Sequence, residues 1–220
     1  MNYVTLLLSL FCTLNMQAQT ELEVFGGYFN STQTAIDYDF SLSPISSYQI
    51  GIGVREVKNS GLILNANINY VKGGSSLPDI HAKSQLDFYQ FGISTQLGYQ
   101  LKLGKFRAEI LGGFNSGTNF RKETFTVFVN PPVTDSSVSD EDLILSPCLC
   151  RSDYKLIEYA AIGTVNIGYT LDATLISNVF LKLNYRHGLT PFYTQNLFEN
   201  EEASIENTGW GVAIGVTRSF

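Results

Sequence analysis

The chain contains only two histidines, His81 and His187, and each is a candidate base for acid–base chemistry. Thr190, Glu199 and Glu201 follow His187 closely in the sequence and would supply a hydroxyl group and carboxylates. A hydrolase needs a nucleophile, a base and an orienting acid in mutual contact. Hydrolysis at His187 is therefore one hypothesis. The alternative is that His187 is a polar residue at the end of a structural element.

A second group of polar residues alternates with apolar ones, as expected for one face of a strand. This group comprises Arg55, Asn65, Asn67, Asn69, Arg107, Glu109, Glu158, Lys182 and Arg186. Glu23 and Asp87 add negative charge to it. Buried charges need partners, and if the segments around Glu158 and Lys182 pair as a hairpin, Glu158 lies near Lys182 or Arg186. The group predicts a paired polar network without catalytic chemistry.

The remaining reactive side chains give little sign of a metal site. Cys148 and Cys150 are separated by one residue, and we interpret them as loop thiols or as a local disulfide. They have no nearby histidine to complete a metal site. The acidic run Asp140–Asp142, even with Asp135, lacks the spacing of a calcium-binding loop. We predict no cofactor and no metal.

The polar group lies in segments that alternate with a period of two, which is typical of strands whose two faces meet different surroundings. Eight such segments are found: Glu21–Asn30, Tyr48–Val57, Leu62–Tyr70, Leu86–Leu101, Phe106–Gly117, Tyr154–Thr170, Val179–Arg186 and Trp210–Phe220. In the third segment, three asparagines occupy one face, where a dry core would leave them without partners. The polar interior of a barrel would accommodate them.

The last segment carries its large residues on one face, at Trp210, Val212, Ile214, Val216 and Phe220. The positions between them are small or polar. A chain that ends on such a strand, with a terminal Phe, is typical of the closing strand of an outer-membrane β-barrel. Aromatic residues near both ends of the apolar faces match the two interfacial girdles of such a barrel.

The connections between the segments are alternately long and short. The long ones are Ser31–Ser47, Gly73–Gln85, Thr118–Asp153 and Leu189–Asn207. This asymmetry predicts an all-β fold: an eight-stranded antiparallel up-and-down transmembrane β-barrel with short periplasmic turns and long extracellular loops. A soluble β-sandwich or a lipocalin-like barrel is the alternative, but it gives no reason for the asymmetry.

The N-terminus and the composition agree with this location. Residues 1–18 contain a short apolar run followed by Ala18, and we expect a signal peptide that is cleaved after Ala18, leaving a barrel domain over 19–220. No segment approaches the roughly 20 apolar residues of a transmembrane helix. The net charge of −6 and the absence of a basic patch argue against nucleic-acid binding.

By these features the sequence resembles the PorT-like outer-membrane β-barrel family of the Bacteroidota. The stretch Leu183–Thr190 is similar to the family's Tyr-x-x-Gly-Leu ending, and the glycine-containing final strand from Gly209 onward fits as well. Arg218 stands where the family often has an aromatic residue. The resemblance covers the mature chain mostly as pattern. It implies an outer-membrane location and no single activity.

The leading hypothesis is therefore a non-enzymatic envelope protein with a packed polar lumen. It would be structural, or would bind a protein partner through loop 118–153, and a PorT-like role in secretion is one version. Its other partners would be outer-membrane lipid and the barrel-assembly machinery, which would recognise the strand ending in Phe220. A narrow channel for small solutes is the alternative. A lipid-modifying hydrolase is the third hypothesis, although lipid A deacylases carry Ser two residues after the histidine, where this chain has Leu189.

Overall fold

The computed structural model describes residues 18–35, 43–78, 82–127, 153–154, 157–171, 173, 175–190, 193–198 and 201–220. All regular secondary structure in these residues is β-strand. None of the described residues belongs to a helix with the length and apolar character needed to cross a membrane. Residues 1–17 of the expected signal peptide lie outside the described residues, as do Cys148, Cys150 and His81.

The strands are long, and most exceed the ranges expected from the sequence. They are β1 (Ala18–Ala35), β2 (Ser43–Lys58), β3 (Leu62–Pro78), β4 (Ala82–Leu103), β5 (Phe106–Val127), β6 (Asp153–Tyr154), β7 (Ile157–Thr170), β8 (Asn178–Gly188), β9 (Tyr193–Phe198) and β10 (Glu201–Ser219).

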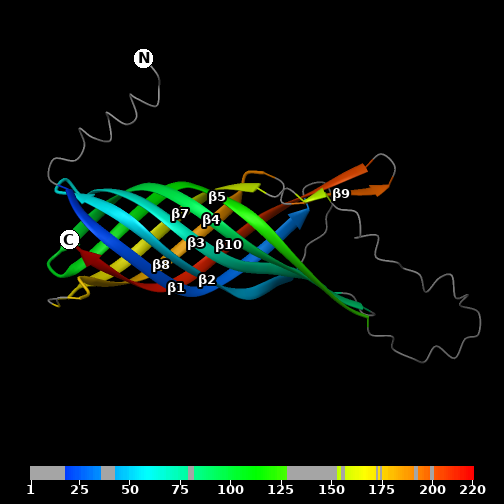
Figure 1. Ribbon diagram of the computed structural model, residues 1–220, viewed down its shortest axis with the longest axis horizontal. Coiled ribbons are helices and arrows are strands. Elements are labelled where there is room, and N and C mark those ends of the chain that lie inside the picture. The colour runs from blue at the N-terminus through cyan, green and yellow to red at the C-terminus, as the bar shows by residue number, and fades with distance from the viewer. Residues whose placement is uncertain are drawn as a thin grey trace, which may run out of the picture.

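Eight of these strands form a closed ring (Figure 1) in the order β1-β2-β3-β4-β5-β7-β8-β10, and β1 pairs with β10 to complete it. Every pairing is antiparallel. At the closing seam, the register of β1 against β10 runs from Glu21 opposite Ser219 to Ala35 opposite Ile205. The short strands β9 and β6 extend the sheet beyond the ring, next to β10. The predicted fold, an eight-stranded antiparallel up-and-down barrel, is confirmed.

The ring is polar inside and apolar outside, the reverse of a soluble barrel. In β8, Leu181 and Leu183 are 41% and 42% exposed, whereas Lys182 between them is 2% exposed. The closing strand shows the same alternation, with Ile214 66% exposed and Ala213 1% exposed. An apolar outer surface of this kind fits a lipid environment.

Aromatic side chains bound the apolar surface at both ends. At one end Tyr70 stacks on Tyr89 with ring centroids 6.3 Å apart, and Tyr28 contacts Trp210 at 5.5 Å. At the other end Phe106 meets Tyr169 edge-on at 5.2 Å. Tyr159 and Tyr169 lie at opposite ends of the outward face of β7. At about 3.3 Å per residue and a tilt near 40°, they delimit a band of about 25 Å.

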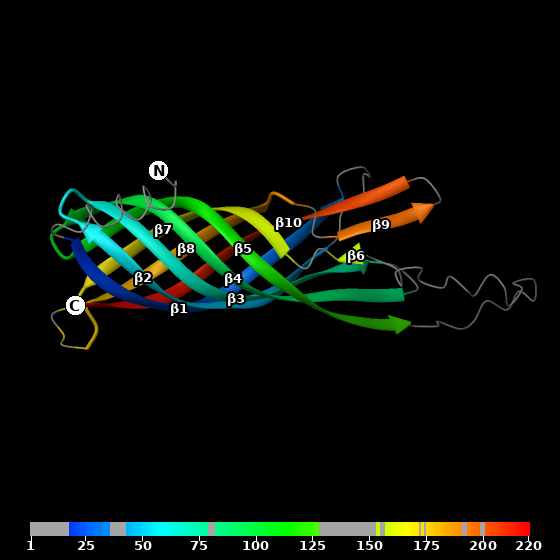
Figure 2. The ribbon, with the colours of Figure 1, turned by 45° about the horizontal axis from the view of Figure 1, so that its top comes forward.

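The two ends of the barrel differ. At the end that holds the C-terminus, hereafter the turn end, short turns join β2 to β3 and β4 to β5, with Gly61 and Gly104 at positive φ. At the other end, hereafter the loop end, β4 and β5 remain paired as far as Ala82 opposite Val127, while β9 pairs with the first part of β10. These two groups of strands project in different directions past the ring (Figure 2).

The loop-end strands correct several expected boundaries. Residues 118–127, expected in the loop 118–153, belong to β5, and most of the range expected as loop 189–207 forms β9 and the start of β10. Tyr154 is not part of the long sixth strand but lies in β6, which pairs with β9. An alternating pattern arises only where the two faces of a strand meet different surroundings, so a strand outside the membrane need not show one.

Candidate functional site

The barrel interior is filled at the turn end by a cluster of charged side chains, hereafter the turn-end cluster: Glu21, Glu23, Arg55, Arg107, Glu109 and Lys182. Arg55 lies at its centre, near the end of β2. Its guanidinium nitrogens are 3.3 Å from Glu21, 3.4 Å from Glu23 and 2.5 Å from Glu109. All four side chains are at most 5% exposed. One guanidinium thus joins three carboxylates contributed by β1 and β5.

Two further cations balance the remaining charge of the turn-end cluster. Arg107 pairs with Glu21 at 3.0 Å and also donates to the hydroxyl of Thr170. The Lys182 ammonium pairs with Glu23 and lies 3.7 Å from the centre of the Phe25 ring. The cluster therefore contains three acids and three bases, as buried charges require if they are to remain ionised.

A second cluster, hereafter the loop-end cluster, closes the lumen at the opposite end. It consists of Gln90, Asn119, Glu158 and Arg186. Arg186 pairs with Glu158 at 2.9 Å, and Gln90 and Asn119 donate to the same carboxylate at 3.0 Å and 3.2 Å. Arg186 also donates to the side-chain amide oxygen of Gln90. The carboxylate of Glu158 is thus held by side chains from β4, β5 and β8.

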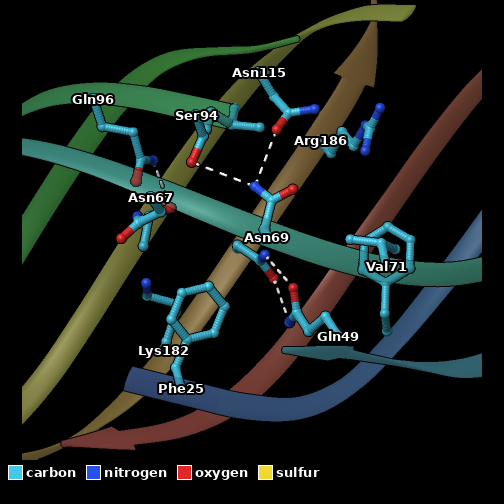
Figure 3. A pocket seen from close by; sticks show the side chains of 14 residues that line it. Phe25, Gln49, Asn67, Asn69, Val71, Ser94, Gln96, Asn115, Lys182 and Arg186 are labelled. Carbon is cyan, nitrogen blue, oxygen red and sulfur yellow. Dashed lines mark hydrogen bonds between the residues drawn. The ribbon is translucent and has the colours of Figure 1, made fainter. Parts of the chain in front are cut away.

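Between the clusters lies a layer of amide side chains around a small cavity (Figure 3). Asn69 donates to Asn115 at 3.0 Å and to Ser94 at 3.4 Å, and Gln49 exchanges hydrogen bonds with Asn184. The cavity has a volume of about 40 Å³. That space suits a few water molecules, and it is far below the roughly 300 Å³ of a small-molecule site.

Apolar side chains complete the filling of the lumen. Val57, Ile63 and Leu111 form a buried cluster near the turn end. Phe29 and Phe88 are 2% and 0% exposed. Among the described residues, paired charges, amides and these apolar side chains occupy the lumen, as expected for an eight-stranded barrel.

The structure places each residue of the predicted polar network on the inner face of the ring. It brings Arg55, Arg107, Glu109 and Lys182 together in the turn-end cluster, where the Asn65 amide also approaches Glu23 at 3.5 Å. Asn67 and Asn69 line the cavity. Glu158 pairs with Arg186 and not with Lys182, which is instead bound to Glu23. Of the two partners expected for Glu158, the structure therefore selects Arg186. The side chain of Asp87 lies outside the described positions.

Two important interior residues were missed by sequence analysis. Glu21 is fully buried and contacts both Arg55 and Arg107. Its position two residues before Glu23 places both on one face, and that spacing could have identified it. Gln90 was assigned to the polar face of its strand but not recognised as the residue linking Asn119, Glu158 and Arg186.

The residues proposed for hydrolysis do not assemble in the described part of the chain. His187 is exposed on the outer face, and its Nδ1 lies 3.3 Å from the Thr208 hydroxyl. The Thr190 hydroxyl accepts a hydrogen bond from the backbone N–H of Tyr159. Glu199 and the side chain of Glu201 lie outside the described positions. Nor do the described His, Cys, Asp and Glu residues form a group of three that could hold a metal ion.

The closing strand presents its large residues to the outside, as its pattern predicts. Trp210, Ile214 and Phe220 are 48%, 66% and 74% exposed, and Val212 and Val216 occupy the same face. The backbone N–H of Phe220 donates to the carbonyl of Thr20 at 3.0 Å, which joins the last residue to β1. The terminal aromatic ring is therefore accessible in the finished barrel.

No protein-family model matches the sequence, and no curated protein matches it. Among solved structures, the outer membrane protein OprG from Pseudomonas aeruginosa is similar with a TM-score of 0.52 and 10% identity, over 92% of this chain and 97% of OprG. Neisserial surface protein A gives a TM-score of 0.47 and 9% identity over 89% and 96% of the two chains. The attachment invasion locus protein Ail of Yersinia pestis gives 0.43 and 8% over 92% and 100%. The similarity to OprG shows the fold, an outer-membrane-type β-barrel.

Proposed function

We propose that this protein is a non-enzymatic outer-membrane barrel that acts through its loop end, while its lumen serves as a closed structural core. Short turns face the periplasm in barrels of this type, and the longer connections face the cell exterior. In this orientation the extended strands β3, β4, β5, β9 and β10 stand on the cell surface.

The observation that carries the proposal is the filling of the lumen. Both charge clusters are internally paired, and the cavity between them measures about 40 Å³. A porin needs a continuous water-filled path, which an eight-stranded ring filled with its own side chains does not provide. A function inside the barrel would also need a pocket large enough for a substrate. The surface extensions are the remaining candidate.

The segment 118–153 is the proposed contact region for a protein partner. It begins in β5, which continues past Thr118 as strand up to Val127, and ends at β6. Binding a neighbouring envelope protein there fits the resemblance to PorT-like proteins, and a part in protein secretion is the specific version we propose.

A planar-bilayer measurement tests the closed lumen. We expect the refolded protein to give no conductance steps above those of protein-free detergent. Conductance steps in the unmodified protein would favour the channel and contradict the proposal.

A lipid A mass pattern that changes on overexpression, and reverts in His187→Ala, would instead favour the hydrolase.

A loop replacement tests the surface role. Residues 128–152 would be replaced by a short Gly-Ser linker, which leaves every strand of the ring unchanged. In a strain that depends on the protein, we expect this variant to fold, shown by a heat-dependent gel mobility shift, but to lose the envelope or secretion phenotype. Asn184→Ala, a substitution inside the lumen, is the control and should retain the phenotype. The reverse pattern would contradict the proposal.

A further inference from the structure

One edge of β5 has no pairing partner where the strand extends past the ring. β5 pairs with β7 only as far as Thr118 opposite Ile157, whereas its pairing with β4 continues to Val127 opposite Ala82. Within the described part of the chain, no strand pairs with this side of β5 over residues 119–127. In Figure 2, β5 leaves the ring together with β4, while β9 and β6 project in a different direction. The backbone of β5 therefore has a free edge over residues 119–127.

The register of β5 identifies the backbone groups that lie on this free edge. In an antiparallel pair, the N–H and C=O groups of successive residues point alternately to one neighbouring strand and to the other. The carbonyl of Lys105, just before β5, accepts a hydrogen bond from the N–H of Thr170 on β7. The odd-numbered residues of β5 therefore point their backbone groups to the β7 side, because the register against β4 shows no shift along its length. Beyond Asn119 these residues are Arg121, Glu123, Phe125 and Val127.

The free edge lies outside the apolar band of the barrel. Ser116 of β5 is opposite Tyr159, which marks the loop-end boundary of that band. Arg121 follows Ser116 by five residues along β5. At about 3.3 Å per residue and a tilt near 40°, this distance places Arg121 on the order of 12 Å beyond the boundary. Unpaired backbone groups are too costly to expose to lipid, but in water they are available to another chain.

β5 lacks most of the features that keep an exposed edge from pairing. Natural edge strands are often very short, or carry proline or a β-bulge. Residues 119–127 contain no proline, and their register against β4 has no bulge. The stretch from Thr124 to Val127 consists of residues with high strand propensity. The edge is therefore suited to accept a further strand.

We propose that the free edge of β5 binds an extended segment of a partner protein, which joins the β3-β4-β5 sheet as a further strand. Edge residues spaced about 6.6 Å apart offer an N–H and a C=O each, which is the repeat of a polypeptide in a strand. A segment of roughly seven residues without proline would pair with all of them. The inference rests on the proposed function, because it specifies how the segment 118–153 contacts a protein partner.

Amide hydrogen exchange in the purified, detergent-solubilised barrel tests whether the edge is open. We expect the amides of Lys122, Thr124 and Thr126, which face β4, to exchange at least about tenfold more slowly than those of Glu123 and Phe125 on the free edge. NMR spectroscopy resolves the individual amides. Equal protection of the two sets would mean that another segment of the same chain covers the edge. Equally fast exchange would mean that β4 and β5 are not paired here, and either result would overturn the proposal.

Exchange in native outer-membrane vesicles tests whether a partner strand occupies the edge. We expect deuterium uptake over residues 119–127, measured by mass spectrometry, to be lower in vesicles than in the purified barrel, because the partner protects the edge amides. Phe125→Pro and Phe125→Thr form a matched pair. Both remove the aromatic ring, but only proline removes the edge N–H and places its own ring on the free edge. Phe125→Thr should keep the protection in vesicles, and Phe125→Pro should lose it.

The same measurements give the outcomes that count against strand addition. Equal uptake by the unmodified protein in both preparations, or protection that persists in Phe125→Pro, would overturn the proposal. Protection lost equally in both variants would assign the contact to the Phe125 side chain and overturn strand addition. If Phe125→Pro fails its heat-shift test, Glu123→Pro and Glu123→Thr serve as the pair.

The envelope phenotype separates this inference from the proposed function. A phenotype that is lost when residues 128–152 are replaced, but persists in Phe125→Pro, would leave the proposed function standing and overturn the edge of β5 as the contact. A phenotype that is lost in Phe125→Pro and kept in Phe125→Thr would support both.

Discussion

At the scale of single residues, Arg55 is the interior side chain whose loss should cost most. Its planar guanidinium contacts Glu21, Glu23 and Glu109 at once, a geometry that a lysine ammonium does not reproduce. Removing one member of a buried ion pair is costly mainly because its partner stays charged in a medium of low dielectric constant. In the turn-end cluster, three carboxylates would lose the same partner, the Arg55 guanidinium.

We therefore expect Arg55→Leu to lower the free energy of unfolding by about 3–5 kcal/mol. Arg218→Leu is the control. Arg218 is exposed on the outer face and its main contact is the Phe220 ring at 5.4 Å, so its loss should cost about 1 kcal/mol or less. Denaturant titration in detergent measures both through the fluorescence of Trp210, the single tryptophan. An Arg55→Leu variant as stable as Arg218→Leu would show that the cluster contributes little.

A double-mutant cycle tests the pairing of Lys182 with Glu23. Lys182→Met and Glu23→Gln should be coupled by at least about 1 kcal/mol in the free energy of unfolding, because each single change leaves the other charge buried. Lys182→Met combined with Glu56→Gln, a residue on the opposite face of the sheet, should be additive within about 0.5 kcal/mol. Coupling as small as in the control pair would mean that the contact seen here is not formed.

Sequence reasoning identified the interior residues better than it identified their partners. Strand alternation is enough to place Arg55 or Lys182 inside. The choice between Lys182 and Arg186 for Glu158 depends on the register of β7 against β8, where Ile162 faces Arg186 and Asn166 faces Lys182. A period of two repeats along the strand and does not reveal which residues face each other. The period of two also gives no indication of partners on distant strands, such as Glu23 for Lys182.

At the scale of elements, the strands are predictable where they cross the membrane and less so beyond it. Within the ring, lipid on one side and packed polar groups on the other impose a strict alternation, as in β8. Towards the loop end, β3 continues through Lys72, Gly73, Gly74 and Ser75, a stretch that reads as a loop. Its backbone is held there by pairing with β4. Cross-strand hydrogen bonds therefore maintain these extensions.

The depth of the apolar surface gives a prediction on one strand. Leu97 and Leu103 both lie on the outward face of β4 and are 54% and 76% exposed, but only Leu97 lies well inside the band. Leu97→Arg should destabilise the barrel in lipid vesicles by about 2–4 kcal/mol, and Leu103→Arg by about 0–1 kcal/mol. Unfolding by guanidinium in vesicles measures the difference. Equal costs would mean that this face does not lie in lipid.

The closing strand gives a prediction about assembly. Phe220 is 74% exposed, so deleting it removes little packing from the finished barrel. We expect the deletion variant to refold in detergent with a normal heat-dependent mobility shift. In cells, the folded form in the outer membrane should fall severalfold if the assembly machinery recognises this residue. Phe106→Ala, which removes an exposed ring at the same end, is the control. A normal cellular level of the deletion variant would remove Phe220 as a recognition element.

At the scale of the whole molecule, the closed ring separates stability from activity. The interior holds the eight strands together through paired charges and amides, while the strands of the ring range in length from 11 residues in β8 to 22 in β4 and β5. The sequence predicted the ring and which residues of its strands point inward.

The pairing of charges inside the barrel also determines which part of the chain carries the net charge. Four lumen carboxylates, Glu21, Glu23, Glu109 and Glu158, are matched by four cations, Arg55, Arg107, Lys182 and Arg186. The formal charge of −6 therefore belongs entirely to the rest of the chain. The protein should migrate in native electrophoresis as though the lumen were uncharged. A net negative charge of this size will repel polyanions and attract cations at low ionic strength.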